Sequence, residues 1–218
     1  MKIGILGGTF NPIHYGHLRA AEETLEMFSL DKIVFIPSGN PPLKTEDLAD
    51  ASHRYSMTKV AVTGNTSFDI LDIESRGPVK SYTVNTLERL KGLFNNSDLF
   101  FILGIDAFLD ISNWWMPEKL LSLADFIVVS RPSNKFSDLV HSPYLNIEKR
   151  ILTKLDNGEI KSFTAELQSM KKIILAKITS ICISSTDIRK CVKKGLSIKY
   201  MLPPEVESYI ISNRLYLD

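Results

Sequence analysis

The sequence carries almost no net charge and no long apolar run, and each absence argues against a class of protein. Lys and Arg number 26 against 25 Asp and Glu, which gives a formal net charge of +1. The chain therefore has no overall field to draw it to nucleic acid or to a membrane surface, and neither is expected as a partner. No stretch of apolar residues is long enough to span a bilayer.

Cysteine is also scarce. Cys182 and Cys191 are the only two, and the chain has no recognisable signal peptide. Reduced thiols in a cytoplasmic protein are therefore expected. Cys and His residues do not cluster with metal-ligand spacing, so no metal site built from protein ligands is expected.

What the sequence does contain is an alternation of short apolar runs with stretches of helical period, which is typical of βαβ units. It predicts an α/β fold with a doubly wound parallel sheet, helices on both faces, and ligands at the carboxyl ends of the strands. The expected strands are 2–6, 32–37, 68–73, 99–103, 126–130 and 178–183, and the expected helices include 18–28, 55–63 and 83–94.

The alternation lapses between residues 133 and 172, where Asn, Asp, Ser and Lys are frequent. Apolar positions around Ile151 and Leu155 predict only one short helix there. We expect this segment to be an insertion or small subdomain within a single domain that spans residues 1–218.

A glycine pair and two histidines follow the first expected strand. Gly7 and Gly8 allow backbone N–H groups to approach phosphate oxygens that a Cβ would block. His14 and His17 stand where a helix begins, and a helix N-terminus offers unpaired N–H groups and a partial positive charge. The segment therefore predicts a site for a nucleotide triphosphate. The alternative is a simple tight turn with histidines that only cap the helix.

Two common phosphate-binding signatures are absent from this segment. The P-loop requires Gly-Lys-Ser/Thr after its glycines, whereas Thr9 and Phe10 follow here. The dinucleotide fingerprint requires glycines at relative positions one, three and six, a spacing that Gly4, Gly7 and Gly8 do not have. Both of these nucleotide-binding classes are therefore excluded.

A second candidate anion site lies near the C-terminus, where residues 183–189 read Ile-Ser-Ser-Thr-Asp-Ile-Arg. Serine and threonine are favoured at helix N-caps, which is one interpretation. The other is that Ser185 or Thr186 donates to a phosphate while Arg189, one turn further on, adds a cationic fork to the same helix start.

The two segments together resemble the nucleotidyltransferase superfamily, whose members carry a His-x-Gly-His element after the first strand. Further segments are similar to those of the nicotinate-nucleotide adenylyltransferase family and occur in the same order. They are residues 37–44, 72–76, 81–87, 104–106, 114–115 and 130–132. The resemblance covers residues 2 to about 132 and 178 through the C-terminal helix. It implies a Rossmann-like domain of nucleotidyltransferase type that transfers the adenylyl group of ATP to nicotinate mononucleotide in NAD biosynthesis.

The resemblance also implies site residues. Catalysis would rest on positioning and charge stabilisation by His14, His17, Lys44 and Arg189. The residues expected to bind ATP are Gly7, Gly8, Thr9, Phe10, His14, His17, Ser185, Thr186 and Arg189. Those expected to bind the acceptor are Asn40, Lys44, Ser81, Tyr82, Thr83, Asp106, Trp114 and Trp115, with Trp114 stacked on the pyridine ring. Mg²⁺ is expected on the substrate phosphates rather than in a protein cage.

Several points stay open in the sequence. Asp106 suits ribose hydroxyls, a metal-bound water or a helix N-cap. Arg54 faces either the pocket or a surface carboxylate. The family often has Asp where Asn11 stands, His where Leu43 stands and Ser where Ala107 stands. The rival functions are a related adenylyltransferase with nicotinamide mononucleotide or phosphopantetheine as acceptor, and a catalytically silent nucleotide-binding module. A homo-oligomer is compatible with the sequence.

Overall fold

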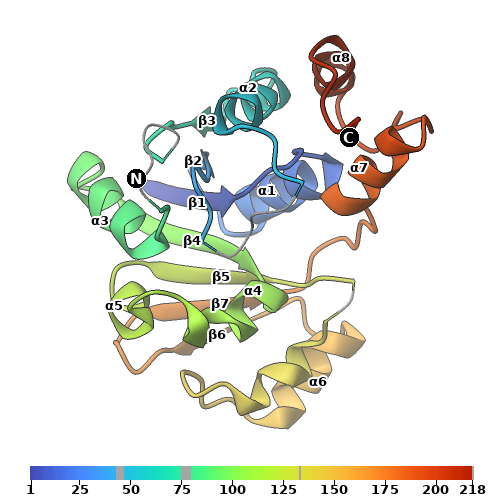
Figure 1. Cartoon of the computed structure of the whole chain (residues 1–218). Helices are drawn as coiled ribbons and strands as arrows, with labels where there is room; N and C mark the ends of the chain where they lie inside the picture. Colours follow the sequence, from blue (N-terminus) through green and yellow to red (C-terminus); the bar gives the residue numbers. More distant parts are fainter. Residues whose placement is uncertain (43–46, 75–79, 133, 218) are drawn as a thin grey trace.

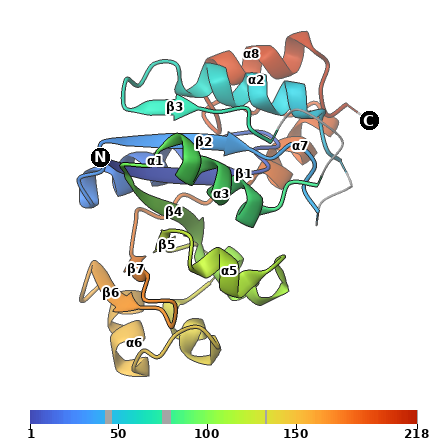
Figure 2. The ribbon, with the colours of Figure 1, turned by 90° about the vertical axis from the view of Figure 1, so that its left-hand side faces the viewer.

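The structure is a computed structural model that describes residues 1–42, 47–74, 80–132 and 134–217. Its centre is a seven-stranded sheet in the order β3-β2-β1-β4-β5-β7-β6, which runs from top to bottom in Figures 1 and 2. The strands are β1 (Lys2–Gly8), β2 (Lys32–Pro37), β3 (Phe68–Ile70), β4 (Asp98–Gly104), β5 (Asp125–Val129), β6 (Ser162–Glu166) and β7 (Lys172–Ala176). All neighbours pair in parallel except β6, which pairs antiparallel with β7.

Helices cover both faces of this sheet. The helices are α1 (Tyr15–Met27), α2 (Ala51–Val62), α3 (Thr83–Leu93), α4 (Ile105–Leu109), α5 (Pro117–Leu121), α6 (Lys149–Asn157), α7 (Ser185–Lys193) and α8 (Pro204–Ser212), with short 3-10 turns η1 (Ile111–Asn113) and η2 (Phe136–His141). One apolar cluster joins the sheet to α3, α4, α5 and α6, and the other joins it to α1, α2, α7 and α8. The predicted doubly wound sheet with helices on both faces is confirmed.

The central strand shows why two separate cores form. Successive side chains of a strand point to opposite faces, so Ile3 and Ile5 belong to one core while Leu6 belongs to the other. A Cβ on Gly4 would lie 2.5 Å from the Cδ1 of Ile33, so glycine lets the second core close over β1. Parallel strands buried on both faces read as continuous apolar runs, which is the pattern seen in the sequence.

One expected strand is wrong. Residues 178–183 form no strand, and β7 is instead the preceding run Lys172–Ala176. Ile173, Leu175 and Ala176 are fully buried beside β5. Two apolar runs of similar length compete for one place in the sheet, and the better-buried run occupies it. Residues 178–183 instead form the connection that leads to α7.

The segment between residues 133 and 172 contains η2, α6 and β6. The single short helix expected around Ile151 and Leu155 is α6, which buries Leu152 and Leu155. β6 was not predicted, because only Phe163 and Ala165 alternate inward and the strand lies at the edge of the sheet. The description of this segment as an insertion or small subdomain stays a prediction.

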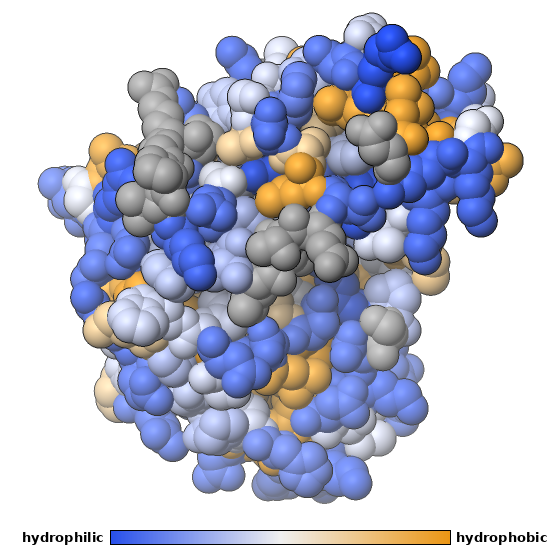
Figure 3. All heavy atoms as spheres, viewed as in Figure 1, coloured by the Kyte–Doolittle hydropathy of each residue, from blue (hydrophilic) through white to orange (hydrophobic). Residues whose placement is uncertain are grey.

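The surface seen in Figure 3 is mainly hydrophilic. Apolar atoms gather in its upper right, where Figure 1 places α8 and the C-terminus. Ile211 and Leu217 are 66% and 53% exposed in this part of the chain. Among the described residues, none of the helices combines the length and the apolar character needed to cross a membrane.

Candidate active site

A cleft of about 1220 Å³ lies at the carboxyl end of the sheet. The ends of β1, β4 and β5 form its floor, and the first turns of α1, α3 and α7 form part of its walls. This is the place where ligands bind in open α/β sheets. The volume exceeds the ordinary range for one small-molecule ligand. The cleft is therefore large enough for two substrates side by side.

Most of the predicted site residues line this one cleft. They are Gly7, Gly8, Thr9, Phe10, His17, Ser81, Tyr82, Thr83, Asp106, Trp114, Trp115, Ser185, Thr186 and Arg189. His14 and Asn40 do not line it: His14 is buried behind the surface, and Asn40 is exposed beside Ser81. Lys44, like Leu43, lies outside the described residues. The early histidine and the late arginine, 172 positions apart in sequence, thus face the same space.

The two histidines at the start of α1 support each other. His14 is the N-cap residue, and its Nδ1 accepts a hydrogen bond from the backbone N–H of Gly16 at 3.1 Å. The Nδ1 of His17 accepts from the backbone N–H of His14 at 3.3 Å, and the two ring centroids are 3.8 Å apart. Because each Nδ1 accepts a hydrogen bond, the proton of each neutral ring lies on Nε2. The helix-capping interpretation is therefore observed, and capping also fixes which ring nitrogen can donate.

Burial decides the charge of His14. The residue is 3% exposed, and burial together with the positive charge of Arg131 lowers the pKa of His14 to about 4. His14 is therefore a neutral imidazole at pH 7. A neutral imidazole that carries its proton on Nε2 can donate a hydrogen bond to a phosphate oxygen.

The loop after β1 is shaped by Phe10. Its φ of 47° is in the left-handed region, which is strained for a bulky residue. The ring is 2% exposed, makes an edge contact with His17 at 5.1 Å between centroids, and lies 3.0 Å from where a Cβ on Gly8 would stand. Glycine at position 8 thus leaves room for this close approach and for a ligand to reach the backbone.

At the start of α7, cap and cleft residues are separate. Ser184 is the N-cap and accepts from the backbone N–H of Asp187 at 3.1 Å. Ser185 donates to the carbonyl of Pro12 at 2.8 Å, and Arg189 donates to the carbonyl of Asn11 at 2.9 Å. Both bonds tie α7 to the loop after β1. The Nε of Arg189 is buried and makes no hydrogen bond within the described part of the chain.

Tyr82 and Trp115 form an aromatic pair on the opposite wall, with ring centroids 5.6 Å apart. Trp115 is 58% exposed, whereas Trp114 is partly buried against the core and donates from Nε1 to Asp110 at 3.3 Å. Both tryptophans line the cleft. Ser81 accepts at Oγ from the backbone N–H groups of Gly39 and Asn40, each at 3.1 Å. The residue just before the N-cap of α3 is thereby joined to the loop that follows β2.

Asp106 is in the first turn of α4 and is not its N-cap, which is Gly104. Its carboxylate is 3.7 Å from the Nε of Arg131 and is 58% exposed. A Cβ on Gly104 would lie 2.6 Å from Arg131 Nε and in contact with the Asp106 carboxylate. Of the three interpretations of Asp106, the cap is therefore wrong, and the carboxylate faces the cleft instead.

Besides Lys80 and Asp110, two further charged cleft residues were not predicted as site residues. Arg131 lines the cleft beside Asp106. Glu74 lines it beside α3, and burial raises its pKa, against hydrogen bonds from the hydroxyls of Thr86, Ser81 and Ser38. Both residues lie in segments that carry the family resemblance, but nothing in the sequence separates a cleft-facing side chain there from a surface one.

Arg54 fits neither expected placement. It has no exposed surface and does not line the cleft, and among the described residues it donates only to backbone carbonyls. In the described ranges, no group of three or more His, Cys, Asp or Glu side chains has the geometry to hold a metal ion.

Comparisons with known proteins agree with this geometry. The cytidylyltransferase-like family model matches residues 5–191. The chain is 43% identical to a "Probable nicotinate-nucleotide adenylyltransferase" of Desulfatibacillum aliphaticivorans and 40% identical to one of Dictyoglomus thermophilum, with all of each chain covered. A Plasmodium falciparum nicotinic acid mononucleotide adenylyltransferase, solved in complex with NaAD, shares the fold with a TM-score of 0.74 at 24% identity. That match covers 99% of this chain and 97% of the other. The chain therefore belongs to the nicotinate-nucleotide adenylyltransferase family, within the cytidylyltransferase-like proteins.

Proposed function

We propose that this chain transfers the adenylyl group of ATP to nicotinate mononucleotide, giving nicotinate adenine dinucleotide and pyrophosphate in NAD biosynthesis. The observation that carries the proposal is that most of the residues expected to bind ATP and most of those expected to bind the acceptor line one cleft. Membership of the family supports the same reaction. A silent nucleotide-binding module would not need the donor and acceptor walls to face each other.

In the proposed reaction a phosphate oxygen of nicotinate mononucleotide attacks the α-phosphorus of ATP. The new O–P bond forms as the bond from the α-phosphorus to the bridging oxygen breaks, and pyrophosphate leaves with that electron pair. A phosphate dianion is already nucleophilic, so no side chain has to remove a proton. Catalysis then consists of alignment and of charge stabilisation on the transferred group and on the leaving group.

The first turns of α1 and α7 are proposed to bind the triphosphate. His17 donates from Nε2 to the triphosphate, with His14 as the neutral donor behind it. Arg189 supplies a positive charge, and Ser185 and Thr186 stand at the N-terminus of α7, where anions bind. Lys44 is proposed as a second cation on the strength of the family resemblance alone. Arg131, whose buried Nε makes no hydrogen bond within the described ranges, adds a further cation to the cleft.

The acceptor is proposed to lie against the aromatic wall. Trp114 and Trp115 offer ring faces for the pyridine, with Tyr82 beside Trp115. Ser81, Thr83 and the backbone near Asn40 line or border that space. Asp106, which lines the cleft with an exposed carboxylate, suits ribose hydroxyls.

Mg²⁺ on the triphosphate is part of the proposal. Mg²⁺ in such sites is held by substrate phosphates, waters and one or two carboxylates rather than by a protein cage. The carboxylates that line the cleft fit this requirement, and the exposed Asp106 is the one best placed to meet a water of the ion. When bound, the ion neutralises charge on the phosphates.

The proposal also covers the setting of the enzyme. We place it in the cytoplasm, as one domain with residues 133–172 as an insertion, and a homo-oligomer is compatible with it. Sedimentation of the purified chain measures the oligomeric state directly.

A panel of acceptors tests the function. The purified chain is incubated with ATP, Mg²⁺ and one of nicotinate mononucleotide, nicotinamide mononucleotide or phosphopantetheine, and pyrophosphate release is measured. The highest kcat/KM is expected with nicotinate mononucleotide. A higher value with either other acceptor overturns the choice of substrate, and no release with any acceptor supports the silent module.

A further inference from the structure

A buried arginine outside the cleft links the two walls of the site. Arg54 is in the first turn of α2 and has no exposed surface. Its Nε donates to the carbonyl of Ala49 at 2.8 Å, just before that helix. One terminal nitrogen donates to the carbonyls of Thr9, at 2.9 Å, and Ser38, and the other donates to that of Gly39 at 2.6 Å.

These carbonyls belong to both substrate-binding walls. Thr9 follows β1 in the loop that leads to the histidines. Ser38 and Gly39 follow β2, and the N–H of Gly39 bonds to Ser81 on the acceptor wall. The ladder between β1 and β2 closes with the N–H of Ser38 bonded to the carbonyl of Gly8 at 2.9 Å. Immediately beyond that point, the guanidinium of Arg54 bridges the loop after β1 and the loop after β2.

This arrangement is unfavourable as a purely structural element. Burying a guanidinium among uncharged groups costs solvation energy, because carbonyl dipoles replace water only in part. Among the described residues, no carboxylate lies within ion-pair distance of Arg54, and the charges of Glu74 and Asp50 act on it only through space. Its neighbour on α2, Met57, fills the same core with an apolar side chain. A planar fork that satisfies carbonyls of three segments at once does what no apolar residue can do.

We propose that Arg54 is a positioning residue that sets the spacing between the loop after β1 and the loop after β2. Through that spacing it aligns the acceptor phosphate with the α-phosphorus of ATP. The inference rests on the proposed function for the identity of the two substrates. It does not require Arg54 to touch either of them.

Two variants test the proposal. Arg54→Met keeps the approximate length of the side chain and removes every donor, whereas Arg54→Lys keeps a charge without the planar fork. For Arg54→Met we expect kcat to fall by about 10²-fold, because small misplacements of reacting groups have effects of that size. The KM values for ATP and nicotinate mononucleotide are expected to stay within about threefold, since each wall still binds its own substrate.

Binding of the product gives a second readout that loss of stability alone would not move. Nicotinate adenine dinucleotide contacts both walls at once, so Arg54→Met should bind it about tenfold more weakly or worse, while the affinity for ATP alone changes less. Arg54→Lys should fall between wild type and Arg54→Met in both measurements. If Arg54→Met does not fold, Arg54→Lys carries the same comparison.

Met57→Ala is the matched control, because it weakens the packing of the same helix and removes no hydrogen bond to either loop. It should lower the melting temperature while leaving kcat within about threefold of wild type. Wild-type kcat in a folded Arg54→Met protein, or equal losses of affinity for ATP and for the dinucleotide, overturns the positioning role.

Hydrogen exchange separates this proposal from the proposed function. Faster amide exchange in residues 8–10 and 38–40 of Arg54→Met is expected whichever acceptor the enzyme uses. Unchanged exchange in those segments overturns the spacing role even if the wild type uses nicotinate mononucleotide. Inactivity of the wild type with that acceptor overturns the proposed function and leaves the exchange result to decide the role of Arg54.

Discussion

The two histidines at the start of α1 have unlike surroundings. His17 lines the cleft, whereas His14 is 3% exposed and holds the helix end and the neighbouring ring in place. Their spacing in sequence predicted a shared site, and the two rings are neighbours, but only His17 lines the cleft. Tertiary packing, of which the edge contact between Phe10 and His17 is one part, places one ring at the cleft and one behind it, and the spacing alone does not encode this packing.

Replacing His17 by alanine should remove a donor to the triphosphate and leave the fold intact. We expect His17→Ala to lower kcat by about 10²-fold or more, the effect typical for one well-placed charge-stabilising donor. Steady-state kinetics with ATP and nicotinate mononucleotide measures it, with circular dichroism as the test of folding. His141→Ala, at an exposed histidine on η2, is the control. Near-normal turnover of folded His17→Ala would remove His17 from the mechanism.

The pKa of His14 predicts a pH dependence of stability. Its folded pKa of about 4 is below the ordinary value of 6.5, so between these values the unfolded chain binds a proton that the folded chain does not. The stabilisation is complete above pH 6.5 and is lost as the pH falls through 4. It amounts to at most about 3 kcal/mol, at 1.36 kcal/mol for each pKa unit.

Urea unfolding at pH 7 and at pH 4 measures this loss. The difference between the two pH values should be smaller in His14→Gln than in wild type by up to about 3 kcal/mol. Glu74, whose raised pKa acts in the opposite sense, is present in both proteins and cancels in the comparison. Equal pH dependence of the two proteins would show that His14 is not held neutral by the fold.

Arg54 shows a limit of predicting a residue's role from its type and its place in the sequence. A lone arginine in a helical stretch suggests a surface or a ligand. Its observed partners are the backbone carbonyls of Thr9, Ser38, Gly39 and Ala49. Every residue has a backbone carbonyl, so the sequence does not show which carbonyls a side chain contacts. Residues whose function passes through the backbone are therefore the ones that residue types reveal least.

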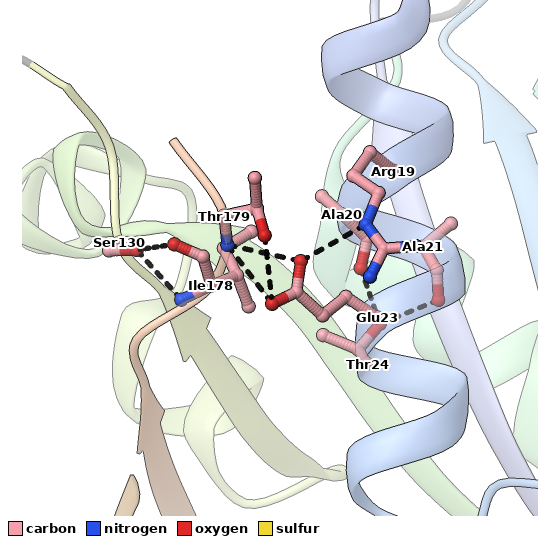
Figure 4. A network of polar contacts seen from close by, with 8 residues as sticks. All are labelled: Arg19, Ala20, Ala21, Glu23, Thr24, Ser130, Ile178 and Thr179. Carbon is pink, nitrogen blue, oxygen red and sulfur yellow. Dashed lines mark hydrogen bonds and ion pairs between the residues drawn. The ribbon is translucent and has the colours of Figure 1, made fainter. Parts of the chain in front are cut away.

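The connection from β7 to α7 is held by side chains on two other elements, as Figure 4 shows. Ser130, directly after β5, donates from its hydroxyl to the carbonyl of Ile178 and accepts from its N–H. Glu23 on α1 accepts from the N–H of Thr179 with both carboxylate oxygens, each at 3.0 Å. These contacts fix the path that brings Ser185 and Arg189 to the cleft.

Weakening the Glu23 contact should loosen α7 at a distance from the chemistry. We expect Glu23→Gln to lower the free energy of unfolding by about 1–2 kcal/mol, because it replaces a charge-assisted hydrogen bond. It should also raise the KM for ATP by up to about tenfold, which corresponds to 1.4 kcal/mol, with a smaller change in kcat. Kinetics at varied ATP and urea unfolding measure the two effects.

Glu22→Gln is the isosteric control, since Glu22 accepts its hydrogen bond from Asn65, which follows α2, rather than from the backbone of this connection. It should leave the KM for ATP near the wild-type value. Equal KM values in the Glu23 and Glu22 variants would show that the connection does not need Glu23 to place α7.

Secondary structure was predictable where no neighbouring apolar run could take the same place in the fold. β2 was predicted with its observed bounds, and β1, β4, β5 and α3 with ends one or two residues off. The strand at 178–183 failed because a neighbouring apolar run was available for the same place beside β5. Periodicity reports that a segment can be buried, whereas the choice between two such segments depends on contacts made across the complete sheet.

The last residues of the chain contact the loop after β1. Tyr216, next to the C-terminus, donates from its hydroxyl to the Oδ1 of Asn11 at 2.8 Å. That oxygen also accepts from the N–H of Ala49, the Nδ2 of Asn11 donates to the carbonyl of Asp47, and the carbonyl of Asn11 accepts from Arg189. The amide at position 11, where the family often has Asp, thus uses its donor as well as its acceptor. No local pattern in the sequence predicts a contact between residues 205 positions apart.

Removal of the Tyr216 hydroxyl should therefore weaken the site from the far end of the chain. Burial raises the pKa of Tyr216, so its phenol stays protonated and donates throughout the working pH range. We expect Tyr216→Phe to lower the free energy of unfolding by about 1–2 kcal/mol, the usual effect of losing a buried hydrogen bond. For a chain of this length each 1 kcal/mol corresponds to a fall in melting temperature of about 2–4 °C. Calorimetry measures the shift, and kinetics should show a higher KM for ATP because Asn11 also holds Arg189.

Tyr200→Phe, at a side chain 90% exposed, is the matched control and should change neither quantity. If both variants melt with the wild type, the bond between the C-terminal segment and Asn11 does not contribute to the folded state.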